Sequence, residues 1–358
     1  MESQTNIIKM MQLMDRPAFC VLDGIITGAN QAALGRLVPL DQPVAPLLAT
    51  GQTEYAAFAD GLLYLTLEIN GTHFGAAIHK VDEYHIFSLE PGNSDGELRV
   101  LSLAAQQLRN PLSSILSLTD RLFPNLERNE ESPASEQIAY INRALHQMQR
   151  IINNMSDADR YCNAAPRLET RDVNAVIEEL FEQAAHLCDS VNVRLEYTGL
   201  STPAYSLIDS EQLERCIYNI LSNALKFTPT GGSIEASLKR KNNILYLTIQ
   251  DSGSGISQNV AGNLFTRYLR EPAIEDKNHG LGLGMSLIRS CACAHGGTVL
   301  VESAKDQGLR LTMSLPIRLD TTNLRSPSVR IDYAGERHHG LIELSDSLPH
   351  ALYKPHKR

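Results

Sequence analysis

Two asparagines and a lysine in the second half of the sequence have a spacing that suits magnesium and phosphate binding. In NILSNALKFTPTGG, Asn219 and Asn223 are one helical turn apart, on the same helix face as Lys226. Amide oxygens can hold Mg²⁺ together with phosphate oxygens, and an ammonium group offsets the remaining negative charge. Taken alone, Asn223 is also consistent with an ordinary polar residue on an exposed helix face.

A short motif, DSGSGI, follows the strand-like run LYLTIQ. Gly253 and Gly255 allow the backbone to pass close to a flat ligand, because glycine has no side chain. The carboxylate of Asp251 can accept a hydrogen bond from an exocyclic amine. By itself a D-x-G-x-G sequence usually marks only a turn, so its meaning depends on the motifs around it.

Two further motifs follow, LFTRYLR, which contains Phe265, and HGLGLGMSLIRSCACAHGG. Gly280, Gly282 and Gly284 lead into a predicted helix, so free backbone amides and the positive end of the helix dipole can meet phosphates. The spacing differs from the dinucleotide-binding fingerprint, and no lysine of a phosphate-binding P-loop follows.

In this order the four motifs resemble the N, G1, F and G2 boxes of the catalytic ATP-binding domain of sensor histidine kinases, over about Val173 to Pro316. The resemblance implies ATP and Mg²⁺ as cofactors. It implies that Asn219 and Asn223 bind the metal with its phosphates, that Lys226 contacts phosphate and that Asp251 reads the adenine amine. The pocket and its lid would be formed by the remaining motif residues, Gly253, Gly255, Phe265, Gly280, Gly282 and Gly284.

The chaperone and gyrase ATPases related to this family carry a glutamate where Asn219 stands, and that glutamate is the base for the attacking water. An amide cannot take that proton. The resemblance therefore favours phosphoryl transfer to a protein group over efficient ATP hydrolysis.

Alternating helix-like and strand-like segments must position these motifs between residues 167 and 318. We expect helices at about 173–188, 210–226 and 285–295 and strands at about 191–198, 233–238, 244–250, 298–303 and 309–315. This pattern predicts an α/β sandwich in which helices cover one face of a sheet. The resemblance makes it a sandwich of the histidine kinase/GHKL ATPase type, within an α+β multidomain chain.

The region from 97 to 162 has a different, helical rhythm. Two segments, each with a seven-residue hydrophobic repeat, are separated by the polar FPNLERNEESP. They predict an antiparallel helical hairpin. One hairpin cannot bury both of its faces, so we expect two chains to pair into a four-helix bundle and form a homodimer. The repeat positions are Leu101, Ala105, Leu108, Leu112, Ile115, Thr119 and Leu122, and then Ile138, Ile141, Leu145, Met148, Ile152 and Met155.

The hairpin resembles the dimerisation and phosphoacceptor domain of the same family, whose first helix carries a motif like H-E-L-R-x-P-L. Gln106 stands where the acceptor histidine would be, and Pro111 fits the helix bend of the family. An amide nitrogen has its lone pair tied up in resonance and an amide oxygen forms no stable phosphoryl product, so Gln106 should not accept a phosphate. Gln107 replaces the acidic neighbour that helps to take the proton. Whether residue 106 is naturally glutamine or an engineered change stays open.

Other residues keep alternative chemistry open. The residue at the position of Asn110 is linked, in the family, to orienting water for removal of phosphate from a partner response regulator. The alternative is that Asn110 merely precedes the proline of a kinked helix. Substitute phosphoacceptors would be His146 on the second helix, or His279 and His295 beside the glycine lid.

The two ends of the chain are less specific. Residues 1–92 mix helices with strand-like runs, and DRPAFCVLDGIITGANQAALGRL resembles the opening of a PAS sensor domain; a small α+β module without a ligand is the alternative. PGNSDGE is a turn-rich linker. Residues 319–358, rich in proline, histidine and charge, are predicted to be mostly disordered.

Composition limits the classes of function. With 358 residues, the chain should hold two or three domains. Its net charge of −9 argues against a protein that wraps nucleic acid. No apolar run approaches the ~18 residues of a membrane span, so we expect a cytoplasmic protein without a transmembrane segment. The CACAH cluster is interpreted as helix packing rather than a metal site, since residues two apart on a helix point to nearly opposite sides.

These inferences converge on a two-component signalling protein that binds Mg-ATP, lacks ordinary autokinase activity and retains possible phosphatase activity toward a response regulator receiver domain. One alternative is an active histidine kinase that uses another acceptor, or whose residue 106 is natively histidine. A second alternative is an ATP-regulated interaction scaffold.

Overall fold

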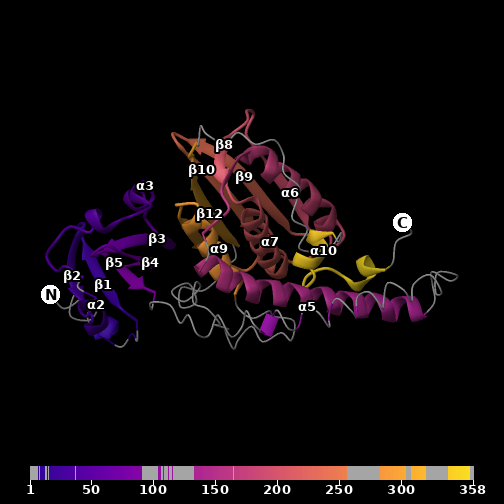
Figure 1. Ribbon diagram of the computed structural model, residues 1–358, viewed down its shortest axis with the longest axis horizontal. Helices are drawn as coiled ribbons and strands as arrows, with labels where there is room; N and C mark the ends of the chain where they lie inside the picture. The colour runs from indigo at the N-terminus through magenta and orange to yellow at the C-terminus, as the bar shows by residue number, and fades with distance from the viewer. Residues whose placement is uncertain are drawn as a thin grey trace.

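The computed structural model describes residues 7, 9–12, 14, 16–36, 38–90, 104, 105, 108, 112, 115, 133–163, 165–255, 283–303, 308–319 and 338–354. These residues form an N-terminal sheet with short helices, a larger layer of sheet and helices, one long helix, and a short C-terminal segment (Figure 1).

The N-terminal part is a five-stranded antiparallel sheet in the order β2-β1-β5-β4-β3. Tight turns at Asp23-Gly24 and Asn70-Gly71 join neighbouring strands, and all four residues have positive φ, which favours Asn, Asp and Gly. Short helices connect β2 to β3. The elements are β1 (Ala18–Leu22), β2 (Ile25–Ala29), α2 (Gln31–Leu34), η1 (Ala45–Leu47), α3 (Gln52–Ala56), β3 (Leu62–Ile69), β4 (Thr72–Val81) and β5 (Tyr84–Leu89).

The larger layered part carries the four motifs on a sheet ordered β11-β12-β10-β9-β7, in which only the β7 and β9 pair is parallel. Helices α6, α7 and α9 cover one face of this sheet (Figure 1), which is the layered arrangement that the sequence predicts. A separate pair, β6 and β8, lies beside them. The elements are β6 (Glu169–Asp172), α6 (Val173–Asp189), β7 (Arg194–Thr198), β8 (Tyr205–Ile208), α7 (Ser210–Phe227), β9 (Ser233–Lys241), β10 (Ile244–Asp251), α9 (Gly284–Ala294), β11 (Val299–Ser303) and β12 (Leu309–Pro316).

Two aspartates set where the long helices of this part begin. Asp172 accepts a hydrogen bond from the backbone N–H of Asn174, and Asp209 accepts one from that of Gln212. Each carboxylate satisfies an amide that the helix leaves unpaired, which stabilises a helix by roughly 1 kcal/mol. The strand expected from residue 191 begins only at Arg194, because a turn with Asn192 at φ 57° precedes it.

The two sheets join edge to edge. β3 pairs with β11 over three residue pairs, so the strands form one continuous ten-stranded sheet. Gly61 has φ 94°, and a Cβ there would lie 2.5 Å from the carbonyl oxygen of Val301, so only glycine permits this approach. On the α9 side, Arg289 forms an ion pair with Glu90 and lies 5.0 Å over the ring of Tyr64.

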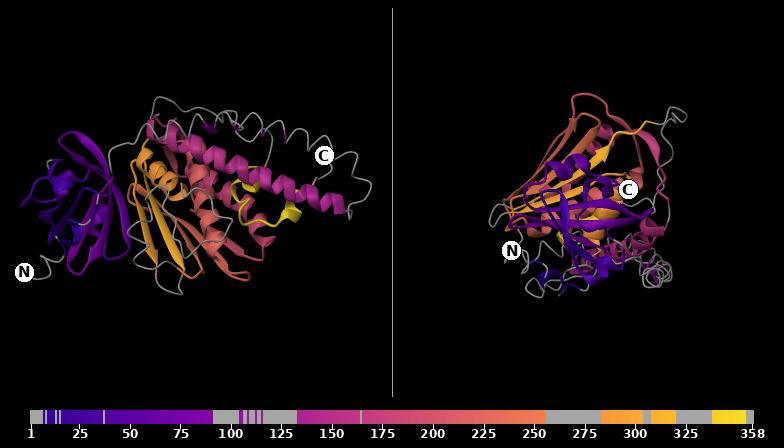
Figure 2. Two further views of the ribbon diagram at one scale, coloured as in Figure 1. Left: turned by 90° about the horizontal axis from the view of Figure 1, so that it is seen from below. Right: turned by 90° about the vertical axis from the view of Figure 1, so that its left-hand side faces the viewer.

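The long helix α5 (Pro133–Asn163) is the second helix of the expected hairpin and runs along the larger layered part (Figure 2). Leu145 and Ile152 are buried against Ala105 and Leu112, which are helical residues of the preceding segment. The buried cluster continues through Met155 and Ala158 to Leu283 and Leu287, so α5 packs on the start of α9.

The predicted disorder of residues 319–358 is wrong for 338–354. This segment forms α10 (His339–Glu343), a turn and η4 (His350–Tyr353), and it lies beside α5 in both Figure 1 and Figure 2. The high charge of the whole tail hid a short apolar pattern, since Ile342, Leu344, Leu348 and Tyr353 are all buried. Contacts with distant helices supply the apolar burial that the local sequence lacks.

Among the described residues, no helix combines the length and apolarity that crossing a bilayer requires.

Candidate functional site

Asn219 lies on the buried side of α7 with an unsatisfied oxygen. Its side chain is 1% exposed, and its Nδ2 donates a hydrogen bond to the carbonyl of Arg215 at 2.8 Å. Its Oδ1 has no hydrogen-bond partner in the described part of the chain. A buried carbonyl oxygen without a partner costs about 1–3 kcal/mol, so such atoms call for a role. An amide oxygen is also a ligand type that Mg²⁺ accepts.

Gly284 keeps the space in front of that oxygen open. It is the first residue of α9, and a Cβ built on it would lie 3.2 Å from Asn219 Oδ1 and 3.9 Å from Asn223 Nδ2. The glycine therefore places the beginning of α9 directly opposite both asparagines. Backbone amides at a helix start are unpaired and attract anions.

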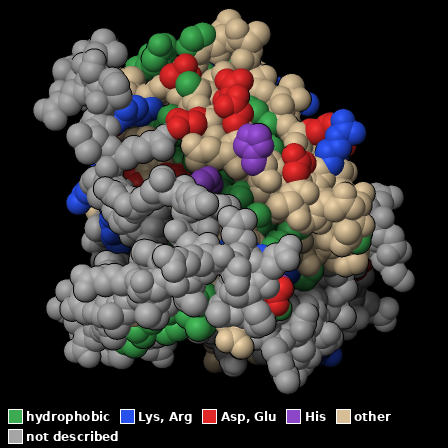
Figure 3. All heavy atoms as spheres, turned by 90° about the vertical axis from the view of Figure 1, so that its right-hand side faces the viewer, with side chains coloured by type: hydrophobic (Ala, Val, Ile, Leu, Met, Phe, Trp, Pro, Cys, Tyr) green, Lys and Arg blue, Asp and Glu red, His purple; other side chains and the backbone are tan. Residues whose placement is uncertain are grey.

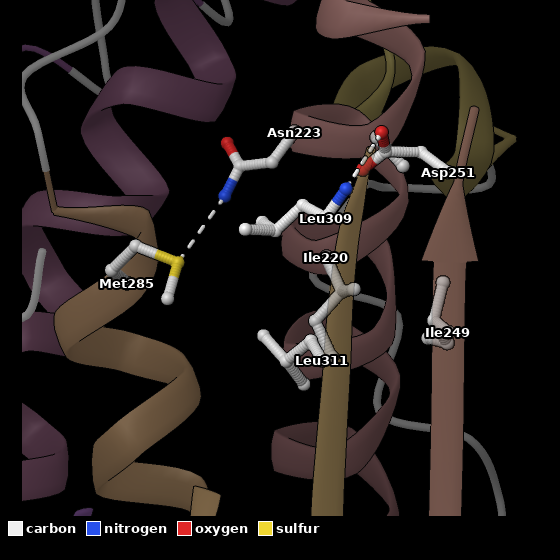
Figure 4. Close-up of a pocket in the computed structure, with 8 residues that line it drawn as sticks. Ile220, Asn223, Ile249, Asp251, Met285, Leu309 and Leu311 are labelled. Atoms are coloured by element: carbon white, nitrogen blue, oxygen red, sulfur yellow. Dashed lines mark hydrogen bonds between the residues drawn. The ribbon is translucent and has the colours of Figure 1, made fainter. Parts of the chain in front are cut away.

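Asn223 is half-buried one turn further along α7, and its Nδ2 lies 3.6 Å from the Sδ of Met285 (Figure 4). Lys226 follows in the last turn of the helix, with its Nζ 5.2 Å above the ring centroid of Phe227. The structure thus places Asn219, Asn223 and Lys226 on successive turns of α7, as their spacing predicts.

Asp251 ends β10 at the opposite side of the same region. Its Oδ1 accepts hydrogen bonds from the backbone N–H groups of Gly253 at 2.8 Å and Leu309 at 3.2 Å. Burial raises the pKa of this carboxyl, and the two backbone hydrogen bonds oppose that rise. Both bonds go to one oxygen and fix the orientation of the carboxylate.

Backbone geometry explains the glycines of DSGSGI. A Cβ on Gly253 would lie 2.5 Å from the carbonyl oxygen of Phe227, so the turn passes too close to α7 for any side chain. Gly255 has φ 69°, a conformation that other residues rarely adopt.

The space between α7, β10, β12 and α9 forms a pocket with a mainly apolar lining (Figure 4). Asp251 and Asn223 supply its polar groups from opposite sides. A flat, largely apolar ligand with a polar edge fits this chemistry, since binding pockets combine apolar walls with a few oriented polar groups. The lining residues are Ile220, Asn223, Ala224, Ile249, Asp251, Met285, Leu309 and Leu311.

Sequence reasoning missed the apolar walls of this pocket. Ile220 is adjacent to Asn219 on α7, and Leu309 and Leu311 alternate along β12. The period-two spacing of the two leucines signals that they share a sheet face, but it does not show which helix or pocket they meet. Met285 directly follows Gly284. Nothing in the sequence around Met285 indicates its contact with Asn223.

Seven sequence-predicted functional residues lie outside the described residues: Gln106, Gln107, Asn110, Phe265, His279, Gly280 and Gly282. Their assignments stay predictions.

Of the two described histidines considered as substitute acceptors, His295 is 3% exposed. Its Nε2 accepts a hydrogen bond from the backbone N–H of Asp209 at 3.0 Å, and its Nδ1 lies 2.8 Å from the carbonyl of Cys291, so both ring nitrogens are occupied. Burial lowers its pKa and favours the neutral ring. His146 has its Nδ1 2.7 Å from the carbonyl of Asn142 and its ring 5.0 Å from that of Tyr353.

The CACAH residues serve helix packing in this structure. Cys291 is buried in the core shared by α9 and α7, and Cys293 Sγ lies 3.5 Å from Thr66 Oγ1 on β3. Within the described ranges, no group of three or more His, Cys, Asp or Glu residues could hold a metal ion.

Family comparisons agree with the geometry. Residues 208–319 match HATPase_c, described as histidine kinase-, DNA gyrase B- and HSP90-like ATPase. Residues 97–161 match HisKA, the His kinase A (phospho-acceptor) domain. The chain thus carries the HisKA and HATPase_c domains of the sensor histidine kinase family.

Individual relatives are similar over part of their length. Hybrid signal transduction histidine kinase D of Dictyostelium discoideum is 28% identical over 60% of this chain and 14% of its own. Histidine protein kinase DivJ of Caulobacter vibrioides is 27% identical over 63% of this chain and 38% of its own. Alginate biosynthesis sensor protein KinB of Pseudomonas aeruginosa is 27% identical over 80% of this chain and 47% of its own. The chain therefore spans less than half the length of these relatives.

Among solved structures, full-length ShkA in complex with AMPPNP is 19% identical, with a TM-score of 0.49, over 61% of this chain and 46% of its own.

Proposed function

We propose that this chain is a two-component signalling protein that binds Mg-ATP and does not phosphorylate itself at residue 106. The observation that carries the nucleotide part is the pair formed by Asn219 Oδ1, a buried acceptor without a partner among the described residues, and Gly284, whose missing side chain leaves that oxygen uncrowded.

The pocket supports an adenine nucleotide as the ligand. Apolar side chains of α7, β10 and β12 suit the faces of a purine ring, and Asp251 is fixed as an acceptor for an exocyclic amine. The start of α9 supplies amides for phosphate.

Mg²⁺ fits the oxygen donor that Asn219 presents to the start of α9. Asn219 Oδ1 is available as a ligand, and the side-chain oxygen of Asn223 is a second candidate one turn away. Mg²⁺ usually keeps several waters and takes only one or two protein ligands besides phosphate oxygens. The metal would neutralise phosphate charge, while Lys226 would offset the remainder. No carboxylate base stands at residue 219, which disfavours hydrolysis by an activated water.

The absence of an imidazole at residue 106 supports the loss of autophosphorylation. A glutamine side chain gives no stable phosphoryl product. Of the substitute acceptors, His295 is excluded by its burial and its two hydrogen bonds, and His146 lies against the C-terminal segment.

A homodimer is supported by the burial pattern of the hairpin. Ala105, Leu112, Leu145 and Ile152 are buried within one chain, whereas the alternate repeat positions, Leu108, Ile115, Ile141 and Met148, are 44–46% exposed. Exposed apolar residues seven apart on both helices form a stripe that a second hairpin would cover.

Two further parts of the proposal rest on sequence or topology. The five-stranded order of the N-terminal sheet, with helices between β2 and β3, is consistent with a PAS-like input domain. Asn110 would orient water for dephosphorylating a response regulator, a task that does not formally need a histidine.

Incubation of the purified chain with Mg²⁺ and γ-labelled ATP, followed by addition of a phosphorylated receiver domain, tests the proposal. We expect nucleotide binding without acid-labile label on the chain, and faster loss of phosphate from the receiver. Acid-labile label would instead support an active kinase. An unchanged phosphate lifetime, insensitive to Asn110→Ala, would support a scaffold.

A further inference from the structure

Residues 338–354 form a docked C-terminal segment outside both matched domains, which end at residues 161 and 319. Leu344, Leu348 and Tyr353 are buried in the same hydrophobic core as α6 and α7. Gly340 approaches α6 so closely that an added Cβ would lie 2.6 Å from Leu187 Cδ1. The segment is therefore packed as an interior element of this structure.

The same segment binds α5 through backbone acceptors. Arg143 donates hydrogen bonds to the carbonyls of Ser345 at 3.1 Å and Asp346 at 3.0 Å, and Asn142 donates one to the carbonyl of Tyr353 at 3.2 Å. Since α5 belongs to the matched HisKA domain and α7 to HATPase_c, residues 338–354 contact both domains at once.

Glu343 lies between an arginine of α5 and an arginine of α7. Its side chain is fully buried, with Oε2 3.8 Å from Arg150 Nε on α5 and Oε1 4.0 Å from Arg215 Nη1 on α7. Arg215 also pairs with Asp157 of α5, and Arg150 pairs with Asp346 at 2.5 Å. Loss of one carboxylate from such a buried network leaves an uncompensated charge, which is strongly destabilising.

We infer that residues 338–354 act as an intramolecular clasp that fixes the HATPase_c domain to α5 and so restrains its movement along the helical hairpin. Movement of the domain requires breaking the Glu343 ion pairs and exposing Leu344, Leu348 and Tyr353 to water. Undocking of the segment would remove this restraint and leave the direct contacts of α5 with α7 and α9. The inference rests on contacts between described residues and does not depend on nucleotide binding.

A charge reversal tests the clasp in the full chain. Glu343→Lys places a cation between Arg150 and Arg215 and should undock the segment. The control is Glu182→Lys, which makes the same charge change at an exposed position on α6. Figure 3 shows the side of the molecule toward which α6 and α10 lie in Figure 1, with acidic side chains grouped in its upper half.

The readout is hydrogen exchange followed by mass spectrometry. In the unaltered chain and in Glu182→Lys we expect slow exchange within residues 341–348, where the amides of Leu341, Leu344, Ser345, Ser347 and Leu348 are hydrogen-bonded within the segment. In Glu343→Lys we expect exchange at least about 100-fold faster there, and faster exchange in the 142–150 part of α5, while β9 and β10 keep their protection. A second variant that ends at residue 337 should show the same change in α5.

Each other outcome overturns the clasp. Fast exchange at 341–348 in the unaltered chain would show that the segment is not docked. Unchanged protection of α5 in both variants would show that the segment restrains nothing. Loss of protection in β9 and β10 of both variants would show that the segment is an inseparable part of the domain core.

Binding of Mg-ADP is measured on the same samples. The affinity of each variant is expected to stay within about threefold of that of the unaltered chain, which separates failure of the clasp from failure of the nucleotide site.

Discussion

Asn219 and Gly284 face each other where α7 packs against α9, so that a methyl group on the glycine would come within 3.2 Å of the unsatisfied Asn219 Oδ1. The sequence separates these residues widely, but the packing of α7 against α9 brings them together. This relationship makes the role of the glycine directly measurable.

Gly284→Ala should weaken binding of Mg-ADP about tenfold, equivalent to ~1.4 kcal/mol, because the methyl group crowds the oxygen that would meet the metal. The helix itself should not suffer, since alanine is the better helix former. Titration calorimetry with and without Mg²⁺ measures the effect. Gly35→Ala, where an added Cβ meets backbone atoms only at 3.5 Å or more, is the matched control and should bind normally. If both variants bind Mg-ADP with equal affinity, Asn219 is not a ligand of the metal.

Asp251→Asn should separate recognition of the base from folding. Asparagine keeps an oxygen that can accept the hydrogen bonds from Gly253 and Leu309, so the turn should persist. The loss of the carboxylate should reduce affinity for ATP by about 10- to 100-fold, since hydrogen bonds to charged groups contribute about 1.5–3 kcal/mol. Competition with a fluorescent ATP analogue measures the change, and a thermal melt checks the fold. If affinity for ATP stays the same while the melt is unchanged, Asp251 does not read the amine.

The residues proposed for nucleotide binding could be named from the sequence because their chemistry is encoded locally. Asn219, Asn223 and Lys226 recur at helical spacing, and Asp251 ends a strand beside two glycines. Contacts between distant segments were not predictable in this way. Nothing near Met285 indicates that it meets Asn223, and nothing near Glu343 indicates Arg150 and Arg215 as its partners.

The same distinction applies to the larger fold. Hydrophobic periodicity predicted α6, α7 and α9 and the five strands of the larger sheet, since period and element type are linked physically, but it missed the short strands β6 and β8. The pairing of β3 with β11 depends on the edges of two sheets, and a strand pattern does not show which edge it will meet. The tail was misjudged because composition averages over residues, whereas docking depends on a few buried side chains.

Stability should depend on pH through Asp157. Its burial raises its pKa to about 6, against the opposing effect of Arg215; Glu343 and Glu211 raise it further, and Arg160 lowers it. An unfolded aspartate titrates near ~3.9. Because the folded-state pKa is higher, this contribution to the free energy of unfolding is fully present below about pH 4 and is lost as pH rises through about 6.

The comparison of the unaltered chain with Asp157→Asn isolates this contribution. The free energy of unfolding of the unaltered chain, relative to the variant, should fall by on the order of 3 kcal/mol between pH 4 and pH 7, from about two pKa units at 1.36 kcal/mol each. Urea denaturation at several pH values measures it. Asp189→Asn, at an exposed residue at the end of α6, should show no comparable trend. A relative stability that rises with pH would mean that Asp157 is stabilised as a carboxylate.

The exposed stripe on the hairpin should hold two chains together. The double substitution Ile141→Lys and Met148→Lys places charges on two apolar positions that are 46% and 45% exposed in the single chain, so it should convert a dimer to a monomer. Sedimentation velocity at micromolar concentration measures the change. Glu136→Lys adds a lysine to an exposed position of the same helix outside the repeat and should leave the dimer intact. A monomeric unaltered chain would contradict the proposed bundle.

Restoring the acceptor chemistry tests the meaning of residue 106. Gln106→His alone should give only weak acid-labile labelling from γ-labelled ATP, because Gln107 still lacks the carboxylate that helps to orient the ring and take its proton. The double substitution Gln106→His and Gln107→Glu should label ~100-fold more strongly than Gln106→His alone, within the range that general acid–base assistance contributes. Addition of Asp251→Asn to the double variant should reduce the label again, since transfer requires bound nucleotide. Labelling of the unaltered chain at the level of the double variant would instead identify another acceptor. If the double variant binds Mg-ATP but remains unlabelled, something other than the missing imidazole prevents transfer. If residues 338–354 prevent it by restraining the HATPase_c domain, removal of these residues from the double variant should restore labelling.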